Sequence, residues 1–324
     1  MPAIRAGFTA IVALIGLLAV SAPAFSQDYP SKPIRLIVPF PPGGPIDVMG
    51  RLIAQRLAPT LGQMVVENKP GAGGTIASRF VAAAEPDGYT LMIATSTTMG
   101  VSPNLYKNIE YDPAKSFAPI AFISSSPFVL VVKPALPIHS ARELIAYAKA
   151  NPGKLNFGYP TATLPHLTGE LFKQRAGVNI QSIPYKGAAN VITDLLAGQI
   201  DVAFEPTQVL LSHIHENKVR PLAITSAARH PKLPNVPTLA ESGLPGFVSV
   251  SWTGVVAPAG TPAAIVQKLN ATINAELNAA EMKTAMDRLG VDMNPGTPAD
   301  FTAFIAEELP KWAGVIKSSG MTLQ

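Results

Sequence analysis

Short apolar runs alternate with amphipathic stretches along the first half of the chain. Ile34–Val38 is apolar, β-branched and bounded by prolines, which is typical of a buried strand. Apolar side chains then recur at helical spacing at Ile46, Met49, Ile53 and Leu57. This alternation of strand and helix predicts a mainly parallel sheet with helices on its faces.

The same pattern continues downstream in two series. The expected strands are Met64–Glu67, Thr90–Ala94, Phe128–Val132, Leu155–Phe157, Ile180–Ile183, Ile200–Phe204 and Val219–Thr225. The expected helices between them are Gly74–Ala84, Ala141–Ala150, Leu164–Arg175 and Ala189–Ala197. The second series begins after Phe128–Val132.

The last part of the chain is almost entirely helical in pattern. Its helices are expected at Ala263–Ala279, Ala280–Leu289 and Ala299–Ser319, with Val291–Met293 the only strand-like piece. Helices without a sheet of their own must bury their apolar faces elsewhere, so the chain is expected to return to the first sheet. It would cross between the lobes near Ile123–Phe128 and again near Val248–Trp252. We therefore expect a two-lobed α/β fold, with residues 27–125 and 251–324 in lobe 1 and residues 126–250 in lobe 2.

Residues 1–26 have the pattern of a secretory signal peptide. Arg5 is the only charge before the apolar run Phe8–Val20, and small residues in Ala22–Ser26 offer cleavage sites. The apolar run is too short to span a bilayer. We expect cleavage after Ser26 and a periplasmic location, with retention as a signal anchor as the alternative.

Composition narrows the classes of function further. The chain has no cysteine, which excludes a lipidated cysteine, disulfides and thiolate chemistry. Its net charge is +4, from basic residues that are scattered rather than clustered, which argues against a nucleic-acid partner. A mild positive charge is compatible with small anions but does not select them.

The turn after the first expected strand is the main candidate for ligand chemistry. Pro39–Gly44 combines prolines that fix the turn with Gly43 and Gly44, which let a ligand approach the backbone. The first amides of the following helix lack intrahelical partners and lie at the positive end of its dipole, so they suit an anion. The segment lacks the lysine of a phosphate-binding loop. An empty tight turn is the alternative.

Enzyme motifs are absent from the sequence. It contains no G-x-S-x-G elbow, no H-E-x-x-H helix and no G-x-x-x-x-G-K-[ST] loop. His213 and His215 are two residues apart on an expected helix, so they point in different directions and do not predict a metal site. We expect no cofactor and no metal.

Several blocks in one order resemble the periplasmic solute-binding component of tripartite tricarboxylate transporters, the Bug proteins. They are VPFPPGGPIDVMGRLIA (Val38–Ala54), VENKPGAGGTIAS (Val66–Ser78), PDGYTLMIA (Pro86–Ala94), PYKGAANVITDLLAGQIDVAFE (Pro184–Glu205), VRPLAITSAARHPKLPNVPTLAESGLPGF (Val219–Phe247) and APAGTP (Ala257–Pro262). The resemblance implies a Venus-flytrap fold, a small organic carboxylate in the cleft and delivery to membrane permease subunits. It also implies that backbone amides of two loops hold the carboxylate. These loops correspond to Phe40–Asp47 and Gly158–His166.

The candidate ligand-binding residues come from these loops and from the ends of expected strands. They are Phe40, Pro42, Gly43, Gly44, Asp47, Ser96, Thr97, Thr98, Tyr159, Thr161, Thr163, His166, Lys186 and Glu205. Hydroxyls after a strand, as at Ser96–Thr98, can donate to a carboxylate or cap a helix. For Asp47 we favour a role in ordering its loop, because its charge would repel an anion.

The second loop departs from the usual family pattern, which is richer in glycine and serine. Tyr159 predicts either packing on an aromatic or longer aliphatic acid or simple coverage of the loop. His166 is expected to cap a helix or contact ligand. Lys186 could supply charge complementarity or be an exposed lysine, and Glu205 could accept a hydrogen bond from a ligand or brace the hinge.

The expected function is therefore capture of a di- or tricarboxylate or an aromatic acid by a monomeric binding protein. An exported enzyme acting on a carboxylic acid is one alternative. A ligand-sensing subunit of a membrane receptor is another, and the sequence does not separate it from transport.

Overall fold

The computed structural model describes residues 29–161, 163–185, 187–289 and 291–319. The expected signal peptide, residues 1–26, lies outside them. The chain divides into two units, residues 1–31 and 32–324, and every described helix and strand belongs to the second.

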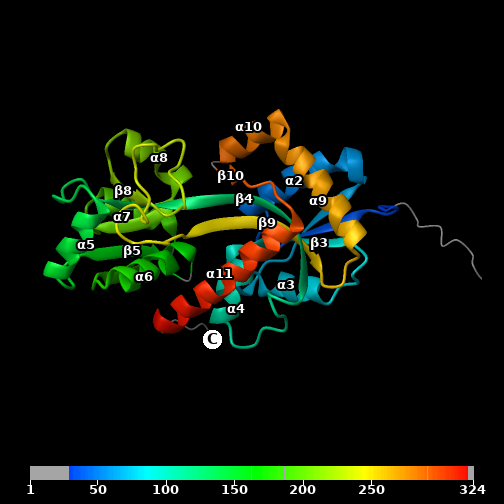
Figure 1. Ribbon diagram of the computed structural model, residues 1–324, viewed down its shortest axis with the longest axis horizontal. Helices are drawn as coiled ribbons and strands as arrows, with labels where there is room; N and C mark the ends of the chain where they lie inside the picture. The colour runs from blue at the N-terminus through cyan, green and yellow to red at the C-terminus, as the bar shows by residue number, and fades with distance from the viewer. Residues whose placement is uncertain (1–28, 162, 186, 290, 320–324) are drawn as a thin grey trace, which may run out of the picture. The chain divides into compact units, whose positions relative to one another are not determined.

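The strands of the second unit form one mixed sheet (Figure 1). The described strands follow the order β2-β1-β3-β9-β4-β7-β5-β6, and β10 and β8 also pair with β4. Half-sheet 1 contains β1 (Ile34–Val38), β2 (Met64–Asn68), β3 (Thr90–Thr95), β9 (Val250–Pro258), β10 (Asp292–Met293) and the first part of β4 (Phe117–Val132). Half-sheet 2 contains the rest of β4 with β5 (Asn156–Pro160), β6 (Gln181–Tyr185), β7 (Val202–Pro206) and β8 (Arg220–Ile224).

Each half-sheet has a parallel part and an antiparallel part. β1 pairs in parallel with β2 and β3, and β5 pairs in parallel with β6 and β7. The long strands β4 and β9 run antiparallel to each other and to their other neighbours. The sheet is therefore mixed rather than mainly parallel, because these two strands close both parallel groups.

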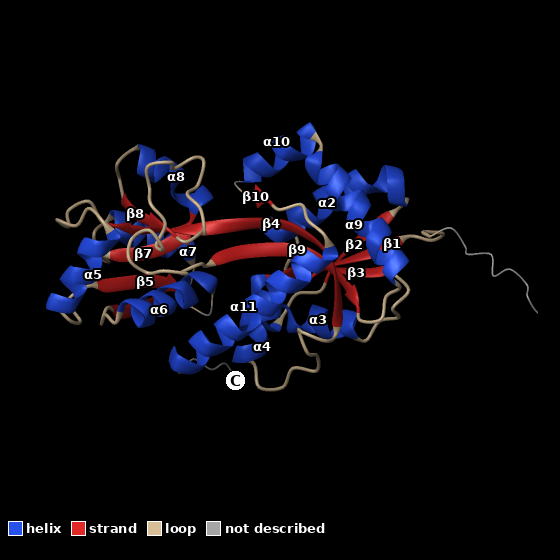
Figure 2. Ribbon diagram, in the orientation of Figure 1, coloured by secondary structure: helices blue, strands red, loops and turns tan. Residues whose placement is uncertain are grey.

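Helices cover both faces of the sheet (Figure 2). Those of the first half are α2 (Pro45–Leu61), the short η1 (Ala72–Gly74), α3 (Thr75–Ala82), the π-helical turn η2 (Thr97–Val101) and α4 (Ser102–Leu105). Those after β4 are α5 (Ala141–Ala150), α6 (Leu164–Ala176), α7 (Ala188–Leu196) and α8 (Thr207–His215). The last are α9 (Ala263–Asn278), α10 (Ala280–Leu289) and α11 (Pro298–Ser319).

Strand β4 changes partners midway along its length. It pairs with β9 from Phe117 to Pro127, with β7 from Phe128 to Val132, and with β8 from Val129 to Val132. The sequence predicted a strand only over the second of these parts. Two shifts in register, after Pro119 and after Phe122, interrupt the alternation of side chains in the first part of β4. The sequence pattern therefore does not indicate a strand there.

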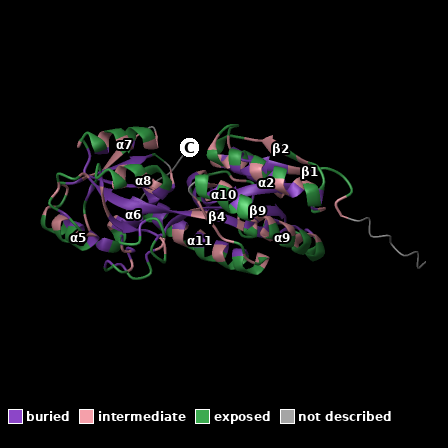
Figure 3. Cartoon of the chain, turned by 90° about the horizontal axis from the view of Figure 1, so that it is seen from above, coloured by how far each residue is buried: buried purple, intermediate pink, exposed green. Residues whose placement is uncertain are grey.

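The final helices return to half-sheet 1, as expected. Phe301 and Ile305 of α11 share a core with Ile37 and Met92 of the first strands. Further along α11, Trp312 is fully buried in the core that also contains Phe157 of half-sheet 2, and its Nε1 donates to Glu308 Oε2 at 2.7 Å. The central strands are largely buried, and exposed residues gather on the outer turns of α5, α7 and α9 (Figure 3).

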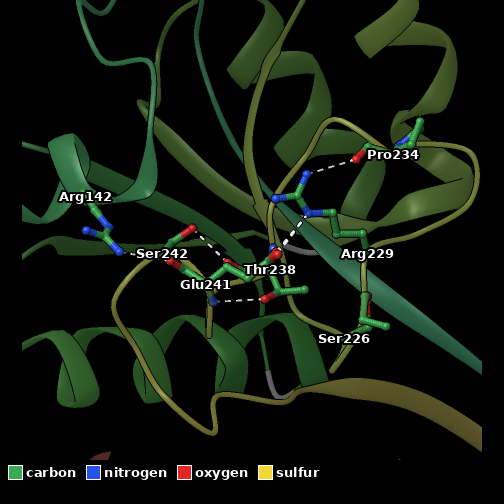
Figure 4. A network of polar contacts seen from close by, with 8 residues as sticks. Arg142, Ser226, Arg229, Pro234, Thr238, Glu241 and Ser242 are labelled. Atoms are coloured by element: carbon green, nitrogen blue, oxygen red, sulfur yellow. Dashed lines mark hydrogen bonds and ion pairs between the residues drawn. The ribbon is translucent and has the colours of Figure 1, made fainter.

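The segment between β8 and β9 has a polar network of its own (Figure 4). Arg229 Nε donates to both carboxylate oxygens of Glu241 at 3.1 Å, and Nη1 donates to the carbonyl of Pro234 at 3.2 Å. Thr238 and Glu241 form a reciprocal capping box, with bonds of 2.7 and 3.0 Å. The Arg229 guanidinium, followed by the Thr238 amide, lowers the pKa of Glu241. A long connection without strands is thereby ordered.

Candidate functional site

A cavity of about 280 Å³ lies where α2, α6 and α8 meet the two long strands. Its lining is a mixture of hydroxyl, amide and apolar groups. The lining residues are Pro45, Ile46, Met49, Thr97, Ser124, Ser125, Ser126, Phe128, Thr163, Leu164, Pro165, Pro206, Gln208, Ser251, Trp252, Thr253 and Val291. None of these described residues is ionisable.

Three helix N-termini open onto this cavity. Helix α2 contributes Pro45 and Ile46, α6 contributes Leu164 and Pro165, and α8 contributes Gln208. Their N-cap residues are Gly44, Thr163 and Pro206, and none of them makes a side-chain capping bond. The first turns therefore keep amides without intrahelical partners at the positive ends of the helix dipoles. This arrangement suits an anion without a cationic side chain.

Asp47 holds the loop that leads into α2. Its Oδ2 accepts from the Gly43 amide at 2.8 Å and from Arg51 Nε at 3.0 Å, and its Oδ1 accepts from Asn68 Nδ2 at 2.8 Å. Asn68 Nδ2 also donates to the carbonyl of Phe40 at 3.0 Å. The Arg51 hydrogen bond, then the Gly43 and Asn68 donors, lower the pKa of Asp47 to about 2. Asp47 is thus an ionised, buried carboxylate whose oxygens are used within the protein.

The glycines of this loop differ in conformation. Gly43 has φ of +80°, which favours glycine, whereas Gly44 has φ of −75° and serves as the N-cap of α2. Pro42 and Gly43 are exposed. The loop therefore has the fixed turn and the open backbone that the sequence predicted, although only the residues just after it, Pro45 and Ile46, line the cavity.

Of the three hydroxyl-bearing residues that follow β3, one lines the cavity and two are buried beside it. Thr97 lines the cavity, whereas Ser96 and Thr98 are buried. Thr98 Oγ1 accepts from the Thr95 amide at 2.9 Å, and Thr95 Oγ1 accepts from the Thr98 amide at 3.1 Å. Tyr111 donates to the Thr98 carbonyl at 2.8 Å. Thr98 therefore fixes the turn that presents Thr97.

The loop before α6 places one of its candidate residues at the cavity. Thr163 lines it, and its Oγ1 donates to the Pro160 carbonyl at 2.6 Å. Thr161 is exposed, and its amide donates to the Tyr185 carbonyl at 3.1 Å. The loop residue Ala162 lies outside the described residues.

Tyr159 and His166 form a buried stack next to this loop. Their ring centroids are 3.7 Å apart and the rings are 13° from parallel, and Tyr159 also stacks on Phe157 in the core. Burial lowers the pKa of His166 to about 4, so the imidazole is neutral at pH 7. Among the described residues its Nδ1 has no hydrogen-bond partner, and its Nε2 lies 4.0 Å from Glu170 Oε1. Both rings lie in the core that supports α6.

Glu205 is fully buried near the end of β7, and neither carboxyl oxygen has a hydrogen-bond partner among the described residues. Burial raises its pKa to about 8, so it is a neutral acid at pH 7. In the register, Phe128 pairs with Pro206 and Val129 with Glu205. Because successive side chains alternate, Glu205 points to the other face of β7 from Pro206, which lines the cavity. Lys186 lies outside the described residues.

The residues that the two long strands bring to the cavity were not predicted from the sequence. These are Ser124, Ser126, Ser251 and Thr253, together with Gln208 from α8. A usable signal was present in VSVSWT (residues 248–253), where polar positions alternate within an apolar run. In β4 the run of three serines interrupts an otherwise apolar strand.

A larger and more open depression, of about 880 Å³, lies over β1 and α3. Three of its cations are each paired with a carboxylate: Lys32 with Asp87 at 3.1 Å, Arg35 with Glu67 at 2.6 Å, and Arg79 with Glu110 at 2.7 Å. The fourth lining cation, Lys69, has its Nζ 4.2 Å from the centroid of the Phe80 ring. The cations of this depression are thus engaged by neighbouring side chains, whereas the smaller cavity combines three helix N-termini with a lining that has no ionisable group. We therefore place the candidate site at the smaller one. Within the described part of the chain, no helix is long and apolar enough to cross a membrane.

Comparison with known proteins identifies the family of the chain. Residues 49–321 match the tripartite tricarboxylate transporter family receptor. The chain is similar to Protein BugT of Bordetella pertussis, with 39% identity over 98% of this chain and 99% of BugT. It is also similar to an R. palustris protein solved with adipate, with 37% identity, a TM-score of 0.73 and coverage of 91% of this chain and 99% of that one.

A third similar protein is MatC of Rhodopseudomonas palustris with bound malate, at 32% identity and a TM-score of 0.70, covering 89% of this chain and 100% of that one. The fold is that of the two-lobed solute-binding proteins. The chain therefore belongs to the tripartite tricarboxylate transporter receptor family, the family of the Bug proteins.

Proposed function

We propose that this protein is a periplasmic binding protein that holds a small organic carboxylate in the cavity between α2, α6 and α8. The observation that carries the proposal is the meeting of three helix N-termini at a cavity without ionisable lining residues. Amides at such termini bind an anion through charge-assisted hydrogen bonds. Similar proteins solved with adipate and with malate support a carboxylate as the ligand.

The contact residues follow from this placement. Thr97 and Thr163 line the cavity, and the backbone after Gly44 supplies amides. Thr97 serves as a hydroxyl donor, whereas the Thr163 hydroxyl already donates to the Pro160 carbonyl. Phe40, Gly43, Asp47 and Asn68 hold that backbone in place. Tyr159, His166 and Glu205 support the walls from the core rather than contact the ligand.

The two half-sheets are the basis of the proposed lobes. Residues 27–125 with 251–324 form one lobe and residues 126–250 the other. The change of partners along β4, between Pro127 and Phe128, supports this boundary, as does the start of β9 at Val250. A ligand that contacts both lobes favours a closed arrangement, because only that arrangement makes both sets of contacts.

The cellular context follows from the sequence and the family. Residues 1–26 act as a cleavable signal peptide, and a chain without cysteine carries no lipid anchor on cysteine. The protein works as a monomer and delivers its ligand to the membrane components of a tripartite transporter. It binds its ligand without changing it chemically.

Thermal unfolding with a panel of aliphatic and aromatic mono-, di- and tricarboxylates tests this proposal. A true ligand at about 100 times its Kd should stabilise the protein by about 2.7 kcal/mol. The matched amide should not, because it lacks the charge. Arg79→Ala, in the larger depression, is the control and should leave Kd unchanged.

Mass spectrometry of the recovered ligand completes the test. An unchanged acid is the expected result, whereas consumption of the acid would identify an enzyme. Absence of stabilisation by every acid in the panel would contradict the proposal.

A further inference from the structure

The two long strands present a row of hydroxyl groups on one side. In the register of β4 and β9, Ser124 pairs with Thr253 and Ser126 pairs with Ser251. Directly opposed residues share a face of the sheet, and residues two apart along a strand share it as well. All four line the cavity, so they form a continuous hydroxyl floor beneath it.

The other face of the same strands carries an aromatic cluster, beside Ser125, whose Oγ accepts from Asn294 Nδ2 at 2.8 Å. Trp252 lies between Ser251 and Thr253 in β9, and its ring packs edge-on against Phe301 at 5.5 Å and Phe304 at 5.7 Å. The register shift between Phe122 and Ser124 lets Phe122 join this aromatic cluster while Ser124 faces the cavity. The bulge in β4 thus turns the Ser124 hydroxyl toward the cavity. Bulges next to functional sites commonly redirect a side chain in this way.

The hydroxyl floor keeps hydrogen-bonding capacity that the protein does not use. Ser124 and Thr253 share one hydrogen bond of 2.7 Å between their oxygens, and Thr253 Oγ1 otherwise reaches only the weak acceptor Met49 Sδ at 3.1 Å. Ser126 donates to Gln208 Oε1 at 2.7 Å, which leaves the Gln208 amide nitrogen available as a donor. The side-chain hydroxyl of Ser251 makes no hydrogen bond to any residue in the described part of the chain, although its backbone belongs to the β4–β9 ladder.

We propose that this floor is a second subsite, which recognises a hydroxyl group on the body of the ligand, and that the preferred ligand is a hydroxycarboxylate. The inference rests on the proposed function, in which the carboxylate lies at the helix N-termini. A hydroxyl both donates and accepts, as the floor does. A second carboxylate placed on the floor could only accept, and it would be a desolvated charge without a cation beside it.

Isothermal titration with matched acids tests the inference. The pairs are butyrate and 3-hydroxybutyrate, succinate and malate, and glutarate and 2-hydroxyglutarate. We expect the hydroxylated member of at least one pair to bind about tenfold or more tightly than its partner, because loss of the hydroxyl leaves the floor groups unpaired.

The double variant Ser124→Ala/Thr253→Val tests whether the hydroxyl floor causes the preference for the hydroxylated acid. It removes both partners of one hydrogen bond and replaces them with apolar groups of similar shape, so the fold should be kept. We expect the preference for the hydroxylated acid to disappear, while the Kd of the acid without the hydroxyl stays within about twofold. Thr302→Val removes an exposed hydroxyl on α11 and should leave the preference intact.

Equal affinity within every pair, or a preference that persists in the double variant, would overturn the inference while leaving carboxylate binding in place. Failure of all six acids and of the wider carboxylate panel would instead contradict the proposed function, and with it the subsite.

Discussion

The side-chain amide of Asn68 joins Asp47 at 2.8 Å and connects the end of β2 to the first turn of α2. The same nitrogen donates to the Phe40 carbonyl, so one side chain holds both the helix and the loop before it. Because the amides after Gly44 belong to this loop and helix, their direction depends on a residue more than twenty positions away in the chain.

Removal of this connection should weaken ligand binding. Asn68→Ala deletes both of these hydrogen bonds and a third one, from Arg51 Nη2 to Asn68 Oδ1 at 3.1 Å, but leaves the ion pair of Asp47 with Arg51. We expect Kd to rise about tenfold or more and the free energy of unfolding to fall by about 1–3 kcal/mol. Titration calorimetry and urea unfolding measure the two effects.

Arg51→Gln is the matched control for this experiment. The Arg51 side chain is 54% exposed, so its ion pair should contribute less than about 1 kcal/mol. Wild-type affinity in Asn68→Ala would show that the loop is ordered without Asn68.

Two glycine substitutions should separate binding from folding. A Cβ at Gly44 would meet only the Pro41 carbonyl, at 3.5 Å, so Gly44→Val should fold normally. Its side chain would crowd the amides of the first turn, and we expect Kd to rise about tenfold or more. Titration calorimetry on the folded variant measures this, and unchanged affinity would remove the loop from the site.

Gly74→Val is the contrasting variant. Gly74 has φ of +88°, and a Cβ there would lie 2.5 Å from the Thr98 methyl group. We expect it to lower the free energy of unfolding by about 1–3 kcal/mol through strain and overpacking. A urea midpoint equal to that of the wild type would contradict this.

Glu205 should make the protein less stable as the pH rises. The folded state keeps its proton up to a pKa of about 8, whereas the unfolded chain releases it near the ordinary value of 4.5. Between these values the folded state binds more protons, so the free energy of unfolding falls by up to about 1.4 kcal/mol per pH unit. Glu205→Gln should lack this slope above pH 6.5 in urea unfolding, and an unchanged slope would show that Glu205 ionises normally.

His166 should act in the opposite direction at lower pH. Its pKa falls from 6.5 to about 4 on folding, so the unfolded state binds more protons between these values and stability falls as the pH is lowered. In the wild type this slope and that of Glu205 largely cancel between pH 4.5 and 6.5. His166→Phe keeps a ring on Tyr159 and should become more stable as the pH falls from 6.5 to 4.5.

Glu205→Gln should become less stable over the same range. Opposite slopes in the two variants are therefore the expected result of urea titrations across this range. Parallel slopes would contradict the assignment of the two titrations to these residues.

Much of the candidate site could be predicted from the turn chemistry. Proline and glycine after β1 fix a turn locally, so Phe40–Gly44 and the open amides of α2 are visible in the sequence. Thr97 and Thr163 could also be predicted as site residues, because each follows the end of a strand. The sequence could not show that Thr98 makes hydrogen bonds with Thr95 and Tyr111 rather than lining the cavity, since that depends on packing beneath the turn.

Tyr159 illustrates the limit of local reasoning. An aromatic residue in a binding loop is compatible with ligand contact or with the core, and only the neighbours decide. Here Phe157 and His166 enclose its ring, so the space it fills belongs to the protein. The sequence contains these residues but not the distances between them.

The sequence by itself determined most of the alternation of strands and helices, the return of the final helices to half-sheet 1, and the fixed turn with open amides after the first strand. These depend on periodicity and backbone conformation, which act over a few residues. Only the tertiary structure decided that Ser124, Ser126, Ser251 and Thr253 form the floor of the cavity. Their alignment depends on the register between strands more than a hundred residues apart and on a bulge in β4, and neither leaves a periodic signal in the chain.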